Sequence, residues 1–166
     1  GAKKPYGPLC DRPDVAVFQT PVLRNNIEVI GPISVRLWIS STAPDTDFTA
    51  KLLDIYPFSS DYPDGYHMNI CEGIQRARYR GGSGKSELLE PGCVYELEII
   101  LEPTANLFTT GHRIRLDISS SNFPRFDVNP NTGEPLGRNT YRIKTTNTLY
   151  HDSLHPSHIS LPIIPV

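Results

Sequence analysis

The strongest constraint on the fold of this chain is a period of two in its apolar residues. The pattern recurs in residues 33–40, 93–101 and 112–119. The apolar positions of the first segment are Ile33, Val35, Leu37 and Ile39. Successive side chains of a β-strand point to opposite faces, so each segment has one face for a core and one for water. The pattern therefore predicts half-buried antiparallel strands, with Arg113, Arg115 and Asp117 as an outward ladder of charges.

Sixteen prolines and twelve glycines interrupt the 166 residues and divide the chain into short segments. Further strands are expected at residues 14–19, 26–30, 48–56, 67–80, 138–147 and 157–163. One amphipathic sheet must bury its apolar face against another. We therefore predict an all-β chain that folds as a two-sheet sandwich or jelly roll, with residues 1–166 forming a single domain.

Charge and cysteine content limit which partners and which compartment can be expected. The chain has 16 Lys and Arg against 18 Asp and Glu, a net charge of −2, and its basic residues are scattered. This distribution predicts neither a nucleic-acid nor a membrane partner. Cys10, Cys71 and Cys93 are odd in number and form no CxxC pair, which favours a reducing compartment such as the cytoplasm. A start at Gly1 without Met suggests a piece of a longer protein.

Two enzyme motifs are nearly matched and both fail. Residues 80–86 end like a phosphate-binding loop, but Tyr79 stands where that motif needs its first glycine. The same stretch lacks GxSxG, because Lys85 occupies the last glycine position. We expect a hairpin loop there, no catalytic residue in the chain, and no cofactor.

Metal ligands are weakly suggested at two places. Oxygen-bearing side chains alternate at Asp127, Asn129 and Asn131, as in a calcium loop, but Arg138 stands where a bidentate glutamate is needed. We therefore predict no metal and keep these three residues as the weak calcium candidates. The pair formed by Asp45 and Asp47 invites the same question, and a turn is the preferred interpretation.

Three histidines, His151, His155 and His158, gather near the C-terminus. Two ligands four residues apart share a face only on a helix, and Pro156 disfavours a helical conformation for His155. We interpret them as loop histidines. A catalytic relay with Ser121 or Ser153 needs an oxyanion hole that no motif indicates.

One loop, residues 119–133, concentrates aromatic, basic and hydroxyl side chains. Its aromatic rings could stack on a sugar, anchor a protein interface, or pack within the loop itself. We predict an interface and keep the other two uses open. The interface candidates are Asn122, Phe123, Pro124, Arg125, Phe126 and Asp127.

Four segments in register, residues 43–54, 73–80, 111–126 and 129–133, together resemble the C-terminal non-catalytic domain of the CocE/NonD hydrolases. That group includes cocaine esterases, α-amino acid ester hydrolases and X-prolyl dipeptidyl peptidases. The resemblance implies a galactose-binding-like jelly roll that follows an α/β-hydrolase domain. The catalytic triad of the family belongs to that preceding domain, so no catalytic role is carried onto any residue here.

The resemblance implies an accessory role for this chain, as the C-terminal piece of a serine hydrolase that cleaves an ester or amide. The implied partner is the α/β-hydrolase domain, whose cleft this domain would help to shape. A homodimer formed by the parent chain is compatible with the same resemblance. Residues 58–62 look inserted relative to the family. The alternative is a carbohydrate-binding module that uses Trp38, Tyr62 and Phe123 as its platform.

Overall fold

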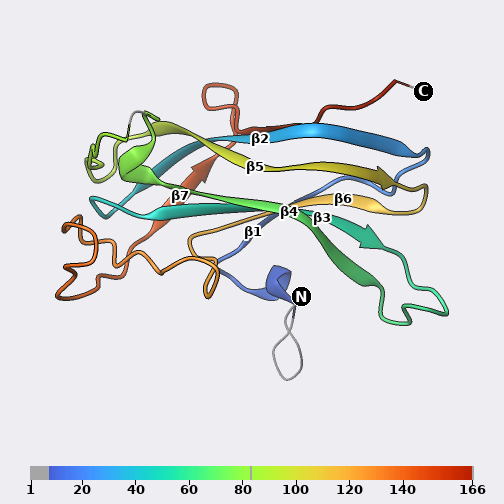
Figure 1. The fold of residues 1–166 in the computed structure, drawn as a ribbon, viewed down its shortest axis with the longest axis horizontal. Coiled ribbons are helices and arrows are strands. Elements are labelled where there is room, and N and C mark those ends of the chain that lie inside the picture. The colour runs from blue at the N-terminus through green and yellow to red at the C-terminus, as the bar shows by residue number, and fades with distance from the viewer. Residues whose placement is uncertain (1–7, 83, 166) are drawn as a thin grey trace.

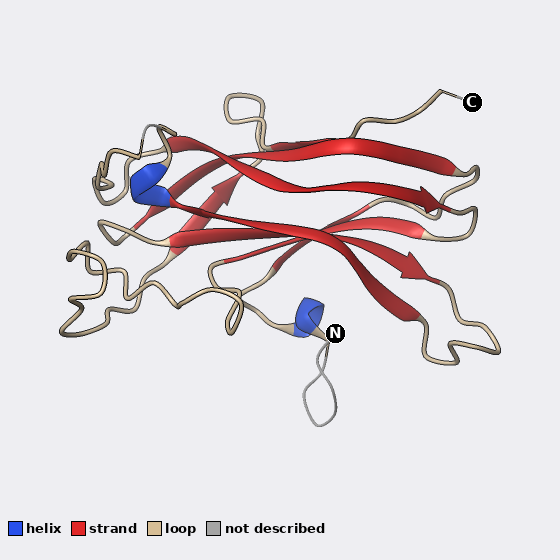
Figure 2. Cartoon of the chain, viewed as in Figure 1, coloured by secondary structure: helices blue, strands red, loops and turns tan. Residues whose placement is uncertain are grey.

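A computed structural model describes residues 8–82 and 84–165 and shows a two-layer sandwich of antiparallel sheets (Figure 1). Within that part of the chain, helical structure is limited to two 3-10 turns, Leu9–Asp11 and Ala77–Tyr79 (Figure 2). The eight described strands are β1 (Ala16–Gln19), β2 (Ile27–Ser41), β3 (Asp47–Tyr56), β4 (Tyr66–Arg76), β5 (Tyr95–Phe108), β6 (Arg113–Ser119), β7 (Asn147–Tyr150) and β8 (His158–Ser160). The expected all-β sandwich is confirmed.

The strands divide into two layers. Sheet A has the order β1-β6-β3-β4, and sheet B has the order β5-β2-β7, with β8 also paired to β2. Every pairing is antiparallel. The strand β2 is the central strand of sheet B, because β5 pairs with one of its edges while β7 and β8 share the other.

The core lies between the sheets and follows the period-two pattern. The apolar positions of residues 33–40 are all at most 2% exposed, as expected for the inward face. On one side the layers close tightly where β4 passes β5. A Cβ atom on Gly73 would lie only 2.4 Å from the carbonyl oxygen of Ile100, so no larger residue fits this crossing. The other side, between β1 and the pair β7 and β8, is less tightly closed.

Three strand predictions need correction. The expected strand 67–80 is too long, because β4 ends at Arg76 and the 3-10 turn Ala77–Tyr79 follows. The expected strands 26–30 and 33–40 are one strand, β2, which continues through a register shift between Gly31 and Ile33. The expected strand 138–147 is wrong, since regular pairing begins only at Asn147. Before that point the chain pairs with a loop: Ile143 N–H donates to the Pro130 carbonyl (3.0 Å).

The expected outward charge ladder is only partly solvent-exposed. Arg115 and Asp117 lie on the outer face of sheet A but are 4% and 3% exposed. The segment around Leu9 lines a small pocket with both residues, and their side chains approach to 3.0 Å. Burial raises the pKa of Asp117, and the nearby Arg115 charge opposes that rise. The outer face of this sheet is therefore partly covered by the N-terminal segment, and its charges are paired.

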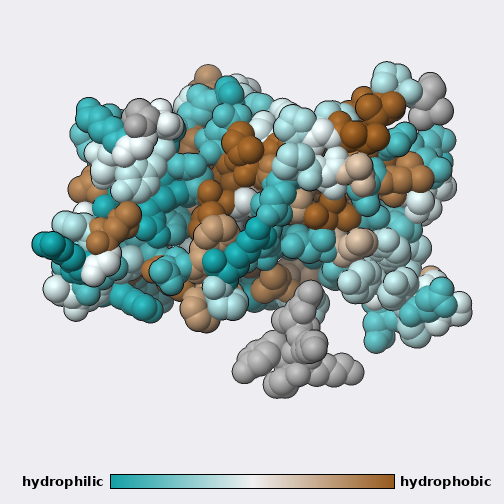
Figure 3. Space-filling model, viewed as in Figure 1, coloured by the Kyte–Doolittle hydropathy of each residue, from teal (hydrophilic) through white to brown (hydrophobic). Residues whose placement is uncertain are grey.

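The surface in view is mostly hydrophilic, with a hydrophobic patch near the C-terminal end (Figure 3). Ile163 and Ile164 are exposed at that end. No helix among the described residues is long and apolar enough to span a membrane.

Candidate functional site

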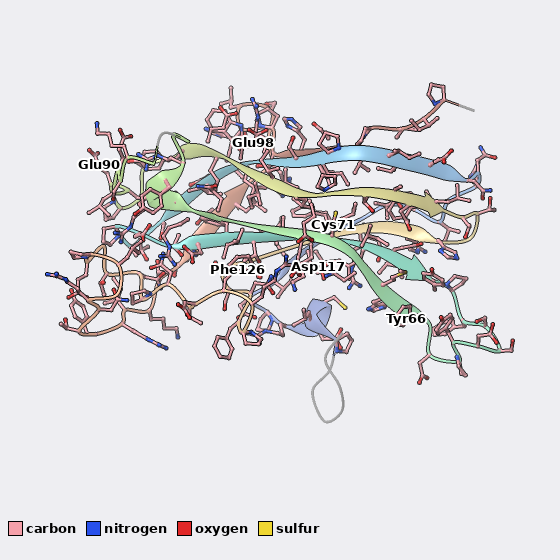
Figure 4. All side chains as sticks on the ribbon, viewed as in Figure 1. Tyr66, Cys71, Glu90, Glu98, Asp117 and Phe126 are labelled. Carbon is pink, nitrogen blue, oxygen red and sulfur yellow. The ribbon has the colours of Figure 1, made fainter. Side chains whose placement is uncertain are left out.

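The predicted interface loop follows β6 and folds into a turn over residues 123–125. The turn is closed by Phe126 N–H, which donates to the Asn122 carbonyl at 3.2 Å. The Phe123–Pro124 peptide bond is cis. Figure 4 shows Phe126 on the same side of sheet A as Asp117, away from sheet B. The loop thus lies over the outer face of sheet A.

Arg125 ties the turn to both sheets. One guanidinium nitrogen donates to Glu72 on β4 (2.6 Å), and the other donates to Glu102 on β5. The guanidinium also lies 5.6 Å from the centre of the Phe126 ring. Because Glu72 and Glu102 come from different sheets, a single side chain holds the turn across the side where β4 passes β5.

Glu72 is the hub of this polar cluster. Its side chain is only 9% exposed and also accepts from Lys51 Nζ at 2.7 Å. Burial raises the pKa of Glu72, but hydrogen bonds from Lys51 and Arg125 outweigh it and lower the pKa to about 2. Lys51 donates in turn to Asn122 Oδ1 at 2.9 Å, which fixes the start of the turn.

The two phenylalanines of the loop have different environments. Phe126 is half-buried beneath the Arg125 guanidinium, whereas Phe123 is 70% exposed. Large apolar side chains that are held in place yet exposed are typical anchors of protein interfaces. Of the predicted interface residues, Phe123 alone combines a large ring with this degree of exposure.

A polar groove of about 740 Å³ runs beside Phe123. Its walls come from the N-terminal segment, the end of β6 and the chain before β7, with Lys51, Ser120 and Asn147 among them. The amide nitrogen of Asn147 donates to Thr46 and Ser120, but its Oδ1 is buried without a partner among the described residues. Buried acceptors are normally satisfied, so this oxygen is an exception, and its burial keeps it away from the surface of the groove.

Sequence reasoning missed a buried ion-pair network at the same end of the sandwich. Asp45 is fully buried and accepts from Arg78 Nε at 2.8 Å. Asp47, 2% exposed, accepts two hydrogen bonds from Arg76 at 2.8 and 2.9 Å. Asp45 does lie in the connection between β2 and β3, as the turn interpretation expects, whereas Asp47 is the first residue of β3. Nothing in the local sequence pairs these aspartates with arginines about 30 residues away.

Of the three weak calcium candidates, Asn129 belongs to this network. The Asn129 amide nitrogen donates to both Asp45 and Asp47, at 2.9 and 2.8 Å. The Asn131 amide donates to the Ile143 carbonyl, while Asp127 is exposed. Among the described residues there is no group of three or more His, Cys, Asp or Glu placed to hold a metal. The Asn129 amide nitrogen is thus a donor to the two aspartates, and its Oδ1, the atom that could bind calcium, accepts from the Asn131 N–H at 2.9 Å.

The residues proposed for a sugar platform do not meet. Trp38 packs edge-on against His155, with ring centres 5.3 Å apart, on sheet B. Tyr62 lies in the β3–β4 hairpin, stacked on Tyr66 at 5.0 Å. That hairpin is at the end of the sandwich opposite the loop that carries Phe123 (Figure 1). No shared aromatic platform forms among these three described residues, so the carbohydrate-binding alternative is not favoured.

His151 and His155 lie in a loop, as expected, but His158 is the first residue of β8. His155 packs against Tyr150 as well as Trp38, and its Nδ1 lies 3.2 Å from Asp152. The Ser157 hydroxyl donates to the Tyr150 carbonyl and accepts from the Trp38 amide, so it is committed to the backbone. His151 and His158 lie elsewhere, at the mouth of a cavity between the sheets.

Comparisons with known proteins agree with the fold and the resemblance. A family model described as the X-Pro dipeptidyl-peptidase C-terminal non-catalytic domain matches residues 2–160. A cocaine esterase from Rhodococcus sp. is 45% identical over 159 residues, which cover 95% of this chain and 27% of the esterase.

Solved structures give the same picture. An aminopeptidase from a marine sediment archaeon, Thaumarchaeota archaeon, matches with a TM-score of 0.88 at 31% identity over 94% of this chain and 27% of its own. An α-amino acid ester hydrolase matches with a TM-score of 0.87 at 31% identity over 93% of this chain and 26% of its own. The chain spans about a quarter of the length of these proteins.

Proposed function

This chain belongs to the family of X-Pro dipeptidyl-peptidase C-terminal non-catalytic domains, and from that membership we propose that it packs on the α/β-hydrolase domain of a CocE/NonD-type serine hydrolase. Its residues 1–166 form one domain of the larger enzyme, and the catalytic serine lies outside them. The parent reaction is acyl transfer from an ester or amide through an acyl-enzyme. The relatives named as cocaine esterase and α-amino acid ester hydrolase support an ester substrate.

The contact surface is the turn that carries Asn122, Phe123, Pro124, Arg125, Phe126 and Asp127, together with the polar groove beside it. The observation that carries this assignment is Phe123, which is 70% exposed on a turn that ion pairs hold to both sheets. A rigid support lowers the conformational entropy lost on docking, so an exposed ring there binds a partner efficiently.

A matched pair of variants tests the assignment, because Phe58 is equally apolar and 77% exposed at the opposite end of the sandwich. In the 166-residue chain, Phe123→Ser and Phe58→Ser should each change the free energy of unfolding by less than about 0.5 kcal/mol. In the hydrolase chain that carries this domain, Phe123→Ser should lower the melting temperature and the rate of ester hydrolysis, while Phe58→Ser should not. Equal effects of the two variants in the hydrolase chain would refute the assignment.

A second measurement addresses catalysis. The 166-residue chain should neither hydrolyse an activated ester nor react with a fluorophosphonate serine probe. The hydrolase chain that carries it should do both. Labelling of Ser121 or Ser153 would instead make this domain an esterase in its own right.

A further inference from the structure

An apolar cavity of about 480 Å³ opens between the sheets on the side away from the β4 and β5 crossing. It lies between β1 and β6 of sheet A and β7 and β8 of sheet B. The deepest walls are core side chains, including Leu37 and Leu52 at 2% and 0% exposure. The other apolar walls include Leu116, Leu149, Ile159 and Leu161. Protein interiors are normally packed without such space, so this cavity is an unusual feature of the sandwich.

The mouth of the cavity joins the two sheets. The Phe18 ring on β1 meets the His151 ring edge-on, with centres 5.8 Å apart, and both residues line the cavity. Gln19, Thr20 and His158 supply polar groups at the same mouth. Among the described residues, no Asp, Glu, Lys or Arg lines the cavity. A ligand that enters it therefore meets no charge that could neutralise its own.

Hydrogen bonding at the mouth selects the polar end of a ligand. His158 Nδ1 lies 2.7 Å from the Pro156 carbonyl oxygen. A carbonyl oxygen only accepts, so Nδ1 carries the proton and Nε2 of the neutral ring is an acceptor. The Ser157 hydroxyl is already committed to the backbone. The group that complements His158 is thus a hydrogen-bond donor, and because no carboxylate lines the cavity to pair with a cation, an uncharged donor such as a hydroxyl fits best.

We propose that this cavity is a binding site for a small uncharged amphiphile, an apolar chain or ring that ends in a hydroxyl group. The apolar part lies between the sheets, and the hydroxyl donates to His158 Nε2 at the mouth. The volume is within the range of small-molecule sites, which are mostly apolar with a few polar groups that orient the ligand. The site is independent of the surface around Phe123, so either assignment can fail without the other.

Straight-chain alcohols are the probe, titrated into the 166-residue chain by calorimetry with methyl chemical shifts as the second readout. Affinity should rise about fourfold for each added methylene from 1-hexanol to 1-octanol, because each buried methylene adds a fixed increment of apolar area. Octanoate and octylammonium should bind at least about tenfold more weakly than 1-octanol, because the cavity would strip water from their charge without pairing it. The shifted methyls should be those of Leu149, Ile159 and Leu161.

A cavity-filling variant, a variant without the acceptor and a control locate the ligand. Ile159→Trp fills the cavity and should abolish 1-octanol binding, and Leu149→Phe serves if that variant does not fold. His158→Ala removes the acceptor and should weaken 1-octanol about two- to tenfold, the range of one neutral hydrogen bond. Leu154→Ala is the control, since Leu154 is 81% exposed in the loop that precedes β8 and does not line the cavity. It should leave binding unchanged.

Several results would overturn the proposal. An absence of heat and methyl shifts with 1-octanol would show that the cavity takes no such ligand. Unchanged binding in a folded cavity-filling variant would place the ligand elsewhere, and equal binding of octanoate would contradict the assigned polar end. If the 166-residue chain binds 1-octanol but the hydrolase chain that carries this domain does not, the hydrolase domain covers the mouth of the cavity. In that case the cavity is part of the contact between the two domains, and the proposal of a small-molecule site is overturned.

Discussion

The two ends of the sandwich are stabilised by different kinds of contact, buried ion pairs at one end and contacts between aromatic rings at the other. At one end, which we call the ion-pair end, Asp45, Asp47, Arg76, Arg78 and Asn129 form a buried network. At the other, which we call the hairpin end, Tyr56, Tyr62, Tyr66 and His112 contact one another through their rings. Figure 1 shows the loops around residues 120–145 at the first end and the β3–β4 hairpin at the second.

The difference lies in the cost of losing one contact. A buried ion loses its hydration when the protein folds, so removing its partner leaves a charge that nothing compensates. Tyr62 and Tyr66 are 39% and 45% exposed. When one of these rings is removed, water can therefore hydrate much of the surface that it covered. The ion-pair end also supports the loop that carries Phe123, while the hairpin end extends beyond the sheets. A fixed surface for a partner is therefore expected at the ion-pair end.

The largest expected effect comes from breaking the Asp45 ion pair. Asp45→Ala leaves Arg78 buried without its carboxylate and removes one acceptor of Asn129. The free energy of unfolding, measured with urea, should fall by about 3–5 kcal/mol. Asp64→Ala at the exposed tip of the hairpin is the control and should cost less than about 0.5 kcal/mol. Similar losses in both variants would remove the distinction between the ends.

A fall in pH should change the stability contributions of two buried carboxylates in opposite directions. The pKa of Glu72 is lowered to about 2 on folding, so its contribution is complete above the unfolded pKa near 4.5 and is lost as the pH falls to 2. That contribution is at most about 3 kcal/mol, because a tenfold change in proton affinity on folding corresponds to about 1.4 kcal/mol of stability. Burial raises the pKa of Asp54 at the hairpin end, and the hydrogen bond from His112 opposes that rise. Asp54 therefore favours the folded state at low pH and loses that effect as the pH rises.

Urea titrations between about pH 2 and 6 test this contrast. The wild-type chain should lose stability as the pH falls from the unfolded pKa of Glu72 near 4.5 to its folded pKa of about 2, and Glu72→Gln should flatten that loss. Asp54→Asn should steepen it, because the opposing group is removed. A steeper profile for Glu72→Gln would contradict the assignment of Glu72 as the hub of the cluster.

A smaller effect is expected for an aromatic contact at the hairpin end. Tyr66 stacks on Tyr62 and meets the Tyr56 ring edge-on at 5.8 Å. Tyr66→Ala should lower the free energy of unfolding by about 1 kcal/mol, the usual worth of an aromatic pair that is partly exposed. Tyr141→Ala, which removes a ring that is 57% exposed in the loop before β7, is the matched control. A loss above about 3 kcal/mol for Tyr66→Ala would make the hairpin end as critical as the ion-pair end.

The smallest stability change is expected at Phe58, the most exposed ring of the hairpin. Its side chain is 77% exposed, and a Cβ on Gly65 would lie 3.8 Å from the ring. Phe58→Ser should therefore leave the melting temperature of the 166-residue chain within a few degrees of wild type. A large decrease would show that residues 58–62 are part of the stable fold.

Much of the fold could be predicted from local pattern. The alternation in residues 33–40 placed each inward side chain correctly, because a strand repeats every two residues wherever it lies. The segment 138–146 was misassigned, because Ile143 pairs with the Pro130 carbonyl, and hydrogen bonds with the end of β2 begin at Thr145 and Thr146. The candidate loop could be found from its residue types, whereas the ion pairs of Arg125 with Glu72 and Glu102 could not.

The sequence by itself determined the all-β class, the inward faces of the strands and the family. These depend on periodicity and on motifs that are local in the chain. Only the tertiary structure decided that Asn129 donates to two aspartates, that Phe123 is exposed while Phe126 is covered, and that His151 and His158 border a cavity. Each of these facts depends on contacts between residues far apart in sequence, whose distance and burial are set by how the two sheets pack.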